Sequence, residues 1–492
     1  MSDNRLTKIL LVILLCLFYG LFLSHKINLV TADLGRHLVN GQVFWEKGQI
    51  LKTNTYSYTE TDYPVLNHHW LSGVIFYKIW QIGGFSGLQL FYILLSTAAL
   101  GLMLWWAYGS GNLLITTLLA LPVINLLAER TEIRPEVFTY FFVSVFWLIL
   151  TKFKDNQKTK WIWLLPVLQI VWVNTHIYFF LGPGLIGCFL LGKRRFKLLT
   201  VFIVDCLAIM VNPYGVKGLL APLTIFNNYG YRLAENQPVW MIEKILSNPH
   251  YLVFKIVFLL LVASFIFVFI KQRKVAVTNL LVAVAISAAG WLAIRNFALF
   301  GLLTLPIMAV NWSGIAKNSQ NQSFLGVTAV AVGIVVYSLT HQFGLGLEVN
   351  NQKAAEFFIK ENLSGPIFNN YDIGSYLIYY FYPQEKVFVD NRPEAYTADF
   401  FTKVYVPMQE DDQVWQKQLE KYQFQAIIFS IKDFTPWGQQ FLIQRVKDPE
   451  WAPVYADQRV IIFLKRNEKN APVISQFELL KERFRISGPG GN

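Results

Sequence analysis

Three residues able to do chemistry follow soon after the first apolar run of the chain. The run is ILLVILLCLFYGLFL, residues 9–23, and the segment TADLGRHLVNG, residues 31–41, contains Asp33, Arg36 and His37. If a helix begins near Asp33, the other two lie on its face at i+3 and i+4. A carboxylate near a membrane surface can act as a general base, with its pKa set by partial burial. The plainer alternative is a helix N-cap, a common role of aspartate before a helix.

Charged residues gather again in ERTEIRPE, residues 129–136. Its three glutamates recur at i, i+3 and i+7, so a helix would place them on one face, but Pro135 is expected to end or restart that helix. The alternative is an ion-paired turn in which Arg130 and Arg134 neutralise the acids. The segment is a second candidate for chemistry.

Arg295 is the most costly cation of the chain, because WLAIRNFALF places it between two apolar spans. A charge at that depth marks a functional site unless its side chain snorkels to the interface. Asn174 and His176, in WVNTHIYF, are polar groups at a helix end and either contact substrate or cap the helix. Asp205, inside VFIVDCLAIM, is expected to make a structural hydrogen bond between helices.

The elements that position these residues are expected to be membrane helices. Of the 492 residues, 54% are hydrophobic and only 15% are charged, with a mean hydropathy of +0.39, whereas about 25% of a soluble domain is charged. The aromatic content fits interfacial belts, and we attribute the net charge of +12 to cytoplasmic loops, not to a nucleic-acid partner. The three cysteines lie in apolar segments without a CxxC pair, which argues against a disulfide framework and a cysteine metal site.

Eleven apolar segments are candidate spans, the first of them an uncleaved N-terminal anchor. The run 161–192 is interpreted as two helices meeting near 174–178, the alternative being one helix broken at 182–184. The segments are 9–24, 87–107, 113–128, 137–151, 161–175, 177–192, 196–211, 251–270, 275–293, 296–311 and 324–340.

The distribution of charge favours one threading of these spans. With the N-terminus inside and a crossing at every span, the inside segments hold fourteen Lys and Arg residues and two acids, which satisfies the positive-inside rule. All seven histidines then fall outside, as do the segments 25–72, 129–136, 212–250 and 342–492. We therefore expect any chemistry on the extracytoplasmic face.

From about residue 342 the pattern changes to that of a small α/β domain, 342–475, followed by a basic tail, 476–492, that we expect to be disordered. The predicted strands are IFNN, KVFVD, AIIFS and RVIIFLKR, and the predicted helices are GSYLIYYF, DDQVWQKQLEKY and PWGQQFLIQRV. VDNRPEAY places Asp390, Arg392 and Glu394 just after a strand, where α/β domains bind ligands. We favour the alternative, a salt-bridged turn.

With these features the chain resembles the GT-C superfamily of membrane glycosyltransferases, which includes oligosaccharyltransferases, protein O-mannosyltransferases and aminoarabinose transferases, and especially its unassigned bacterial members. Members have an acidic residue soon after the first helix, here Asp33, and a long outer loop ending in a histidine-containing segment, here NHHWLSGVIFYKIWQIGG. A second acidic site follows the third helix, here within ERTEIRPE. The resemblance covers residues 5–310 by architecture, and NNYDIGSYLIYY and KVFVDNRPEAY extend it into the C-terminal part.

The resemblance implies inverting transfer of a sugar from a polyprenyl-phosphate donor to an acceptor outside the membrane. Asp33 would then be the general base and Glu132 the second acid. Arginine would bind the leaving phosphate, because its guanidinium can do so bidentately. A divalent metal, if present, would be held by Asp33, Glu132 and His69. The substrate-binding set would be Arg36, His37, His68, His69, Arg134, Asn174, His176 and Arg295.

The predicted protein is thus a multi-pass α-helical membrane protein, GT-C-like, with about eleven transmembrane helices in 1–341 and an extracytoplasmic α/β domain. It would be an enzyme of cell-envelope glycosylation in the bacterial plasma membrane, whose partners are a polyprenyl-phosphate sugar, membrane lipids and a lipid, glycan or protein acceptor. One alternative is a transporter or lipid-binding protein, although the sequence shows no inverted repeat. Another is a non-catalytic scaffold of envelope assembly, because Leu34 follows Asp33 where many members have a second acid.

Overall fold

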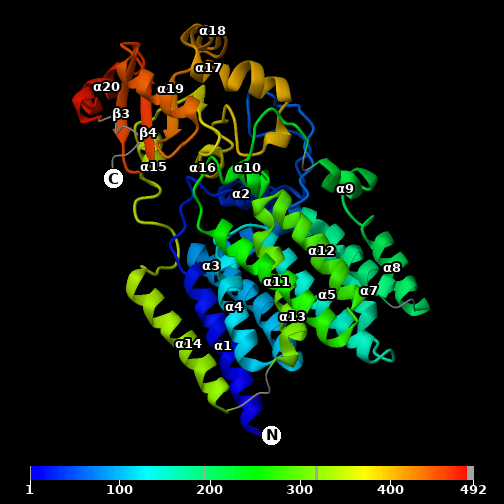
Figure 1. Cartoon of the computed structure of the whole chain (residues 1–492). Coiled ribbons are helices and arrows are strands. Elements are labelled where there is room, and N and C mark those ends of the chain that lie inside the picture. The colour runs from blue at the N-terminus through cyan, green and yellow to red at the C-terminus, as the bar shows by residue number, and fades with distance from the viewer. Residues whose placement is uncertain (1, 193–194, 225–226, 316–319, 485–492) are drawn as a thin grey trace. The chain divides into compact units, whose positions relative to one another are not determined.

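The structure is a computed structural model that describes residues 2–192, 195–224, 227–315 and 320–484. It is mostly helical, with a small sheet in the C-terminal part (Figure 1). The chain forms two compact units. The helical unit comprises Met1–Lys26, Ile79–Phe226 and Leu233–Gly346, and the α/β unit comprises Ile27–Lys78, Asn227–Arg232 and Leu347–Asn492.

Helices, most of them apolar, make up the helical unit. They are α1 (Ser2–Leu23), α3 (Trp70–Ser110, in this unit from Ile79), α4 (Leu113–Leu127), α5 (Glu136–Asp155), α6 (Leu164–Thr175), α7 (Leu181–Gly192), α8 (Phe196–Ala208), α9 (Val216–Leu220), α10 (Val239–Ile242), α11 (His250–Gln272), α12 (Val277–Leu292), α13 (Phe297–Asn311) and α14 (Gln320–Thr340).

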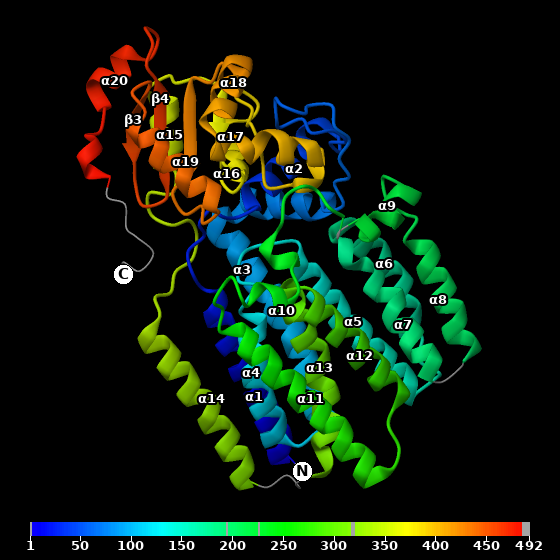
Figure 2. The ribbon, with the colours of Figure 1, turned by 45° about the horizontal axis from the view of Figure 1, so that its top comes forward.

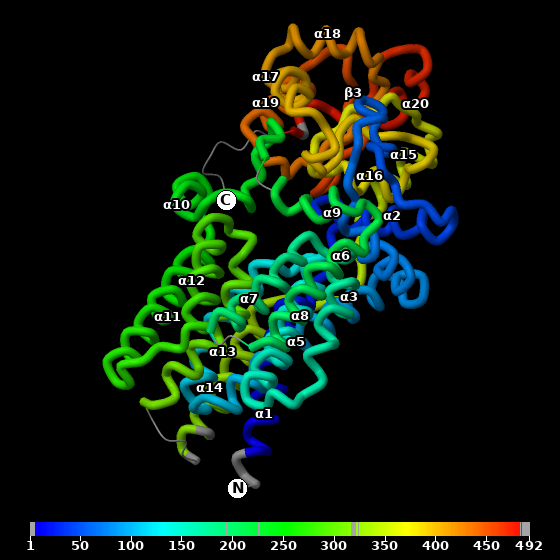
Figure 3. The backbone as a smooth tube through the Cα atoms, turned by 90° about the vertical axis from the view of Figure 1, so that its right-hand side faces the viewer, coloured from blue at the N-terminus to red at the C-terminus, as the bar shows by residue number. Residues whose placement is uncertain are grey.

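The core of this unit is built around α13. All but one of its 15 residues are buried, and it packs against α4, α11 and α12. On another side of α12 lies α7, which in turn contacts α8 (Figure 3). Pro122 and Pro306 lie inside α4 and α13, as membrane helices tolerate when their neighbours satisfy the freed backbone groups.

Five helices of the described residues are long and apolar enough to cross a membrane, and five further apolar segments are shorter, with 10–17 residues. These lengths and compositions are those of a multi-pass membrane protein. All eleven predicted segments fall on helices, and the run 161–192 divides as predicted, with a 3₁₀ turn at Ile177–Phe180 between α6 and α7. The number of crossings and the orientation stay predictions, and Lys193, Arg194 and Lys317 of the charge pattern lie outside the described residues.

The α/β unit contains a four-stranded sheet of order β1-β2-β4-β3, in which β1 and β2 are parallel and the other pairs antiparallel (Figure 2). Its strands are β1 (Ile367–Asn369), β2 (Ala426–Ser430), β3 (Trp451–Ala456) and β4 (Val460–Lys465). Its helices are α2 (Leu34–Lys47), α15 (Lys353–Lys360), α16 (Gly374–Phe381), α17 (Pro407–Glu410), α18 (Asp412–Tyr422), α19 (Pro436–Lys447) and α20 (Ala471–Phe477).

Three of the four predicted strands are confirmed, and the prediction for KVFVD is wrong. This segment pairs outside the sheet, with the first loop: Val387 N–H donates to Tyr56 O at 3.0 Å, and Tyr58 N–H donates to Val387 O at 3.2 Å. The fourth strand is β3, which the sequence analysis missed because Pro453 lies inside it. Proline is tolerated there because β3 is an edge strand, and the register shifts beside it.

The α/β unit is thus built from parts far apart in the sequence. A Cβ on Gly35 of α2 would lie 2.5 Å from the Ser375 carbonyl oxygen of α16, and one on Gly41 would lie 2.1 Å from the Gly73 carbonyl oxygen of α3. Glycine at these two positions lets α2 approach both backbones closely. The predicted boundary at residue 342 stays a prediction, and residues 485–492 of the predicted tail lie outside the described residues.

Candidate functional site

The candidate site of the helical unit begins at the turn between α4 and α5. α4 ends at Leu127, and α5 begins at Glu136 after Pro135, whose φ of −56° is preset for a helix start. Pro135 therefore restarts the helix. Because residues 129–135 are not helical, the three glutamates of the turn have different surroundings.

Glu136 is the buried centre of an ion network. Arg130 donates two hydrogen bonds to its carboxylate, from Nε to Oε2 at 3.1 Å and from Nη2 to Oε1 at 2.8 Å. The Tyr140 hydroxyl donates to Glu136 Oε2 at 3.1 Å. Arg130 also donates from Nη1 to Glu235 Oε2 at 2.7 Å, so that one guanidinium joins the turn to the loop before α10.

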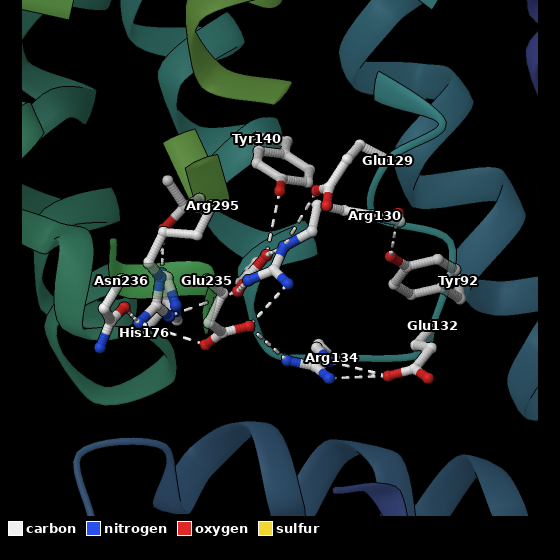
Figure 4. A network of polar contacts seen from close by, with 12 residues as sticks. Tyr92, Glu129, Arg130, Glu132, Arg134, Tyr140, His176, Glu235, Asn236 and Arg295 are labelled. Carbon is white, nitrogen blue, oxygen red and sulfur yellow. Dashed lines mark hydrogen bonds and ion pairs between the residues drawn. The ribbon is translucent and has the colours of Figure 1, made fainter. Parts of the chain in front are cut away.

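Arg295, from the 3₁₀ turn Ile294–Asn296 between α12 and α13, completes this network. Its Nη1 donates to Asn236 Oδ1 at 3.0 Å and lies 3.5 Å from Glu235 Oε1, and its Nη2 lies 3.4 Å from Glu136 Oε1. Figure 4 shows Arg130, Glu235 and Arg295 pointing toward one another. Arg295 is thus held by two carboxylates and does not snorkel.

Glu132 has a different environment. It pairs with Arg134, Oε2 to Nη2 at 2.7 Å, and its side chain is 36% exposed. Arg134 also donates from Nη1 to Glu235 Oε2 at 3.2 Å. Glu132 therefore holds Arg134 at the edge of the network, and the predicted ion-paired turn is present.

Burial and nearby charges shift the pKa values of Glu129 and Glu235 in opposite directions. Burial raises the pKa of Glu129 to about 7, against the nearby charge of Arg130 and with a contribution from Glu136. Burial alone would also raise the pKa of Glu235, but Arg130 and the other two arginines together hold it below its usual range. Glu129 is thus the acid of the turn that titrates near neutral pH.

Two other predicted residues of this unit are tied to nearby groups. His176 shares a hydrogen bond of 2.7 Å between Nδ1 and Thr139 Oγ1, and it is drawn with the network in Figure 4. Asn174 donates to the carbonyl oxygens of Ile170 at 2.7 Å and Val211 at 2.8 Å, which supports the capping alternative. Asp205 is fully buried in α8, and among the described residues none donates a hydrogen bond to its carboxylate.

In the α/β unit, Asp33 stands at the N-cap position of α2. Its Oδ1 accepts a hydrogen bond from the Asn391 side-chain amide and not from the first turn of the helix. The following residues are anchored as well, since the Arg36 N–H donates to Ser375 Oγ at 2.9 Å. The carboxylate is therefore oriented by the C-terminal part of the chain.

A small pocket of the same unit gathers several of the predicted binding residues. It is lined by Arg36, Asn40, Leu51, Val65, Leu66, Asn67, His68, His69, Arg392 and Glu394. The His37 ring contacts that of His69, with 5.8 Å between centroids. Arg36 is only 7% exposed, and within the described residues its Nε–H has no hydrogen-bond acceptor. Burial raises the pKa of Glu394, against the charges of Arg36 and Arg392.

The turn in VDNRPEAY is salt-bridged, as the sequence analysis favoured. Arg392 donates to both carboxylate oxygens of Asp390, from Nε at 2.7 Å and from Nη2 at 2.6 Å, and both side chains are buried. Nη2 also donates to Asn54 Oδ1 at 2.8 Å. The Tyr396 hydroxyl donates to Asp390 Oδ2 at 3.2 Å. This network fixes the first loop, residues 25–72, to the turn that carries Asn391 and Glu394.

The predicted residues thus form two groups. The helical unit brings Arg134 and Arg295 together through Glu235. The α/β unit brings Arg36, His68 and His69 to one pocket, and the His37 ring lies against that of His69. The convergence of the two groups on one cavity stays a prediction. Across the part of the chain that the structure describes, no three His, Cys, Asp or Glu side chains are arranged to hold a metal ion. The predicted metal set of Asp33, Glu132 and His69 draws on both units and stays a prediction.

Sequence reasoning missed Glu235, Asn236 and Asn391. Glu235 and Asn236 come from ENQPVW, a polar segment of an outer loop that gave no spacing signal toward residues 130 or 295. The usable signal was charge: Arg295 at the membrane surface requires an acidic partner, and the loop 212–250 contains only two acids, Glu235 and Glu243.

Comparison with known proteins finds solved structures with a similar fold. No family model and no curated protein matches the chain. Solved structures of the archaeal oligosaccharyltransferase AglB from Archaeoglobus fulgidus do match. One, in complex with an inhibitory peptide and a dolichol-phosphate, is 12% identical with a TM-score of 0.58, and it covers 94% of this chain and 74% of AglB. The apo form is 11% identical with a TM-score of 0.59, and it covers the same shares of the two chains. A complex with Zn and sulfate is 11% identical with a TM-score of 0.52, and it covers 92% of this chain and 73% of that chain. The chain therefore has a fold similar to that of this archaeal oligosaccharyltransferase.

Proposed function

We propose that the chain is an integral membrane glycosyltransferase that transfers a sugar from a polyprenyl-phosphate-linked donor to an extracytoplasmic acceptor. The observation that carries the proposal is the likeness of 94% of the chain to an oligosaccharyltransferase solved with a dolichol-phosphate and a peptide. Because a fold hosts more than one chemistry, the site residues must supply the rest of the argument.

Asp33 is the proposed general base. It would take the proton of the acceptor hydroxyl or amine while the acceptor atom bonds to the anomeric carbon. The bond from that carbon to the phosphate oxygen breaks, and its electron pair leaves with the polyprenyl phosphate. The Asn391 amide holds one carboxylate oxygen of Asp33, which supports this role because an oriented base is more effective than a mobile one.

Arg36 is the proposed phosphate ligand of the α/β unit. A buried guanidinium with an unbonded N–H is costly, and a bound anion would satisfy it. His68 and His69 line the same pocket and can donate further hydrogen bonds, and His37 lies against His69. Glu394 lines this pocket too, and burial raises the pKa of its carboxyl, which lessens its resistance to protonation beside an anion.

The network of the helical unit is proposed to supply the second acid and further substrate contacts. Glu132 is the acid that the sequence favours, whereas Glu129 has the proton affinity near neutral that acid–base work requires. Arg134, Arg295, His176 and Asn174 remain proposed substrate contacts. The arginines are already paired with carboxylates, so a phosphate would have to exchange with Glu235. A divalent cation stays a proposal that chelation tests, and no step above requires it.

Substitution of Asp33 tests the function. Membranes containing the chain are incubated with a panel of polyprenyl-phosphate sugars, and released polyprenyl phosphate is measured by mass spectrometry. Asp33→Asn should lower the transfer rate by about 100-fold to 10,000-fold, the usual contribution of a general base. Asp62→Asn is the matched control, because Asp62 is exposed in the same loop. Transfer by Asp33→Asn at the parental rate would refute the assignment.

A non-catalytic scaffold is the second candidate, favoured by the pairing of Arg130, Arg134 and Arg295 with carboxylates in the ion network. It predicts release of polyprenyl phosphate at the rate of empty membranes for every donor of the panel. The same panel therefore separates the two functions.

A further inference from the structure

A second cavity lies in the helical unit, among the ends of four helices. It has a volume of about 250 Å³ and lies where α5 and α7 end and where α8 and α12 begin. Its apolar lining consists of Leu150, Phe153, Phe189, Leu198, Val275, Ala276 and Val277. Gly192 lets the end of α7 approach the start of α12 closely beside this cavity, since a Cβ there would lie 2.0 Å from Thr278 Oγ1.

The mouth of this cavity is basic. Lys154 and Arg195 line it, and the segments 152–160, 195–197 and 271–274 next to it contain nine Lys and Arg residues and one acid, Asp155. None of the described residues forms an ion pair with the Lys154 ammonium. The cavity is therefore apolar inside and positively charged at its opening.

Arg195 is held in place at this mouth. Its Nη1 donates to the Phe153 carbonyl oxygen at 3.0 Å and its Nη2 to that of Lys154 at 3.3 Å, and its guanidinium lies over the Phe153 ring at 5.5 Å. A guanidinium has five N–H donors, so others remain for a ligand. A fixed cation with spare donors beside an exposed lysine suits a phosphate group.

The surroundings of the cavity are those of a membrane interface. Leu191, Phe196 and Val277 are 66%, 86% and 51% exposed, as side chains facing lipid would be. Trp161 and Trp163, which follow α5 after a short turn, are 59% and 44% exposed. Exposed tryptophans of this kind mark the headgroup level of a bilayer.

We infer that this cavity binds one anionic phospholipid of the bilayer, with an acyl chain along the apolar lining and the phosphate between Lys154 and Arg195. Basic pockets between membrane helices suit anionic headgroups, and the attraction is strongest close to the fixed charges. The inference is independent of the proposed glycosyl transfer, because none of the residues assigned to that reaction lines this cavity.

Native mass spectrometry of the full-length protein in mild detergent tests the inference. The probes are phosphatidylglycerol and phosphatidylcholine with the same acyl chains, titrated separately. The parent protein should bind one phosphatidylglycerol more tightly than phosphatidylcholine by at least about fivefold, the effect of one lysine near a charged lipid. Equal affinity for the two lipids would overturn the inference.

Two variants locate the site. Lys154→Gln, at an exposed side chain, should weaken binding of phosphatidylglycerol about fivefold and leave phosphatidylcholine unchanged. Lys158→Gln is the matched control, since it removes the same charge from the same segment but not from the cavity lining. An equal loss in both variants would show a diffuse basic surface and refute the site. Ala276→Trp, which fills the cavity, should abolish the tight binding in protein whose thermal unfolding is unchanged; retained binding in such protein would also refute it.

Discussion

Replacement of Glu129 by glutamine should stabilise the protein at alkaline pH and have little effect in mild acid. Burial raises the pKa of this carboxyl from 4.5 to about 7, so the folded protein holds a proton that the unfolded chain has lost. Between about pH 4.5 and pH 7 the folded state binds more protons, and stability falls as the pH rises. Glutamine removes that dependence.

The magnitude follows from the two pKa values. The raised pKa of Glu129 destabilises the folded state by about 1 kcal/mol at pH 5 and by about 3 kcal/mol at pH 8. These values use 1.36 kcal/mol per tenfold change in proton affinity. Arg130 lies 3.9 Å from the carboxylate, and its favourable charge is already included in the pKa of about 7. We therefore expect Glu129→Gln to be about 2 kcal/mol more stable, relative to the parent, at pH 8 than at pH 5.

The assay is reversible unfolding in mixed detergent micelles at pH 5, 6, 7 and 8, followed by circular dichroism. Glu132→Gln is the matched control in the same turn, because its carboxylate pairs with Arg134 and its side chain is 36% exposed. That variant should show no gain at pH 8. Parallel pH profiles for the parent and Glu129→Gln would refute the reasoning, because the carboxyl would then titrate alike in the folded and unfolded states.

Three further predictions concern the α/β unit. Asp390→Asn should lower the free energy of unfolding by about 3 to 5 kcal/mol, since it leaves the buried guanidinium of Arg392 without its charged partner; denaturant unfolding measures this. Gly41→Ala should destabilise by about 3 kcal/mol or more, because the new methyl group would lie 2.1 Å from the Gly73 carbonyl oxygen; thermal unfolding measures this. Asn391→Ala should slow sugar transfer about tenfold to 100-fold with unchanged expression, because the proposed base loses its orienting hydrogen bond; initial rates at saturating donor measure this.

Each of these predictions has an outcome that contradicts it. Parental stability of Asp390→Asn would mean that water, not the carboxylate, satisfies the arginine. Gly83→Ala is the control for the glycine prediction, since a Cβ there meets nothing within 4 Å, and equal effects of the two alanines would refute the close approach. A parental transfer rate for Asn391→Ala would show that its hydrogen bond does not position the base.

Local patterns predicted the helices well, because membrane helices depend on the apolar character of their own residues. Arg295 was also predictable as a special residue, since the cost of a charge at that depth is visible in the sequence. Its partners were not, because Glu136 precedes it by 159 residues in the chain and Glu235 comes from a loop. Spacing alone could not distinguish Glu129 from Glu132, because residues 129–135 are not helical and the surroundings of each acid depend on the fold.

The strand predictions failed where pairing overrode local preference. KVFVD has the composition of a strand, but its neighbours are residues of the first loop. WAPVYA contains a proline that argues against a strand, and only its edge position permits one. Neither outcome can be predicted from the local sequence, because both depend on which other segment pairs with KVFVD or WAPVYA in the fold.

The discontinuous α/β unit has a consequence for the timing of biogenesis. The α2 segment leaves the ribosome among the first, whereas Ser375, to which the Arg36 backbone donates, is 339 residues later. At the usual pace of translation that gap lasts roughly 20 to 70 s. During this interval the segment with Asp33 has neither its anchor nor Asn391. A nascent or truncated chain therefore cannot assemble this part of the site, and proteolytic sensitivity of α2 should end only when synthesis of the C-terminal part is complete.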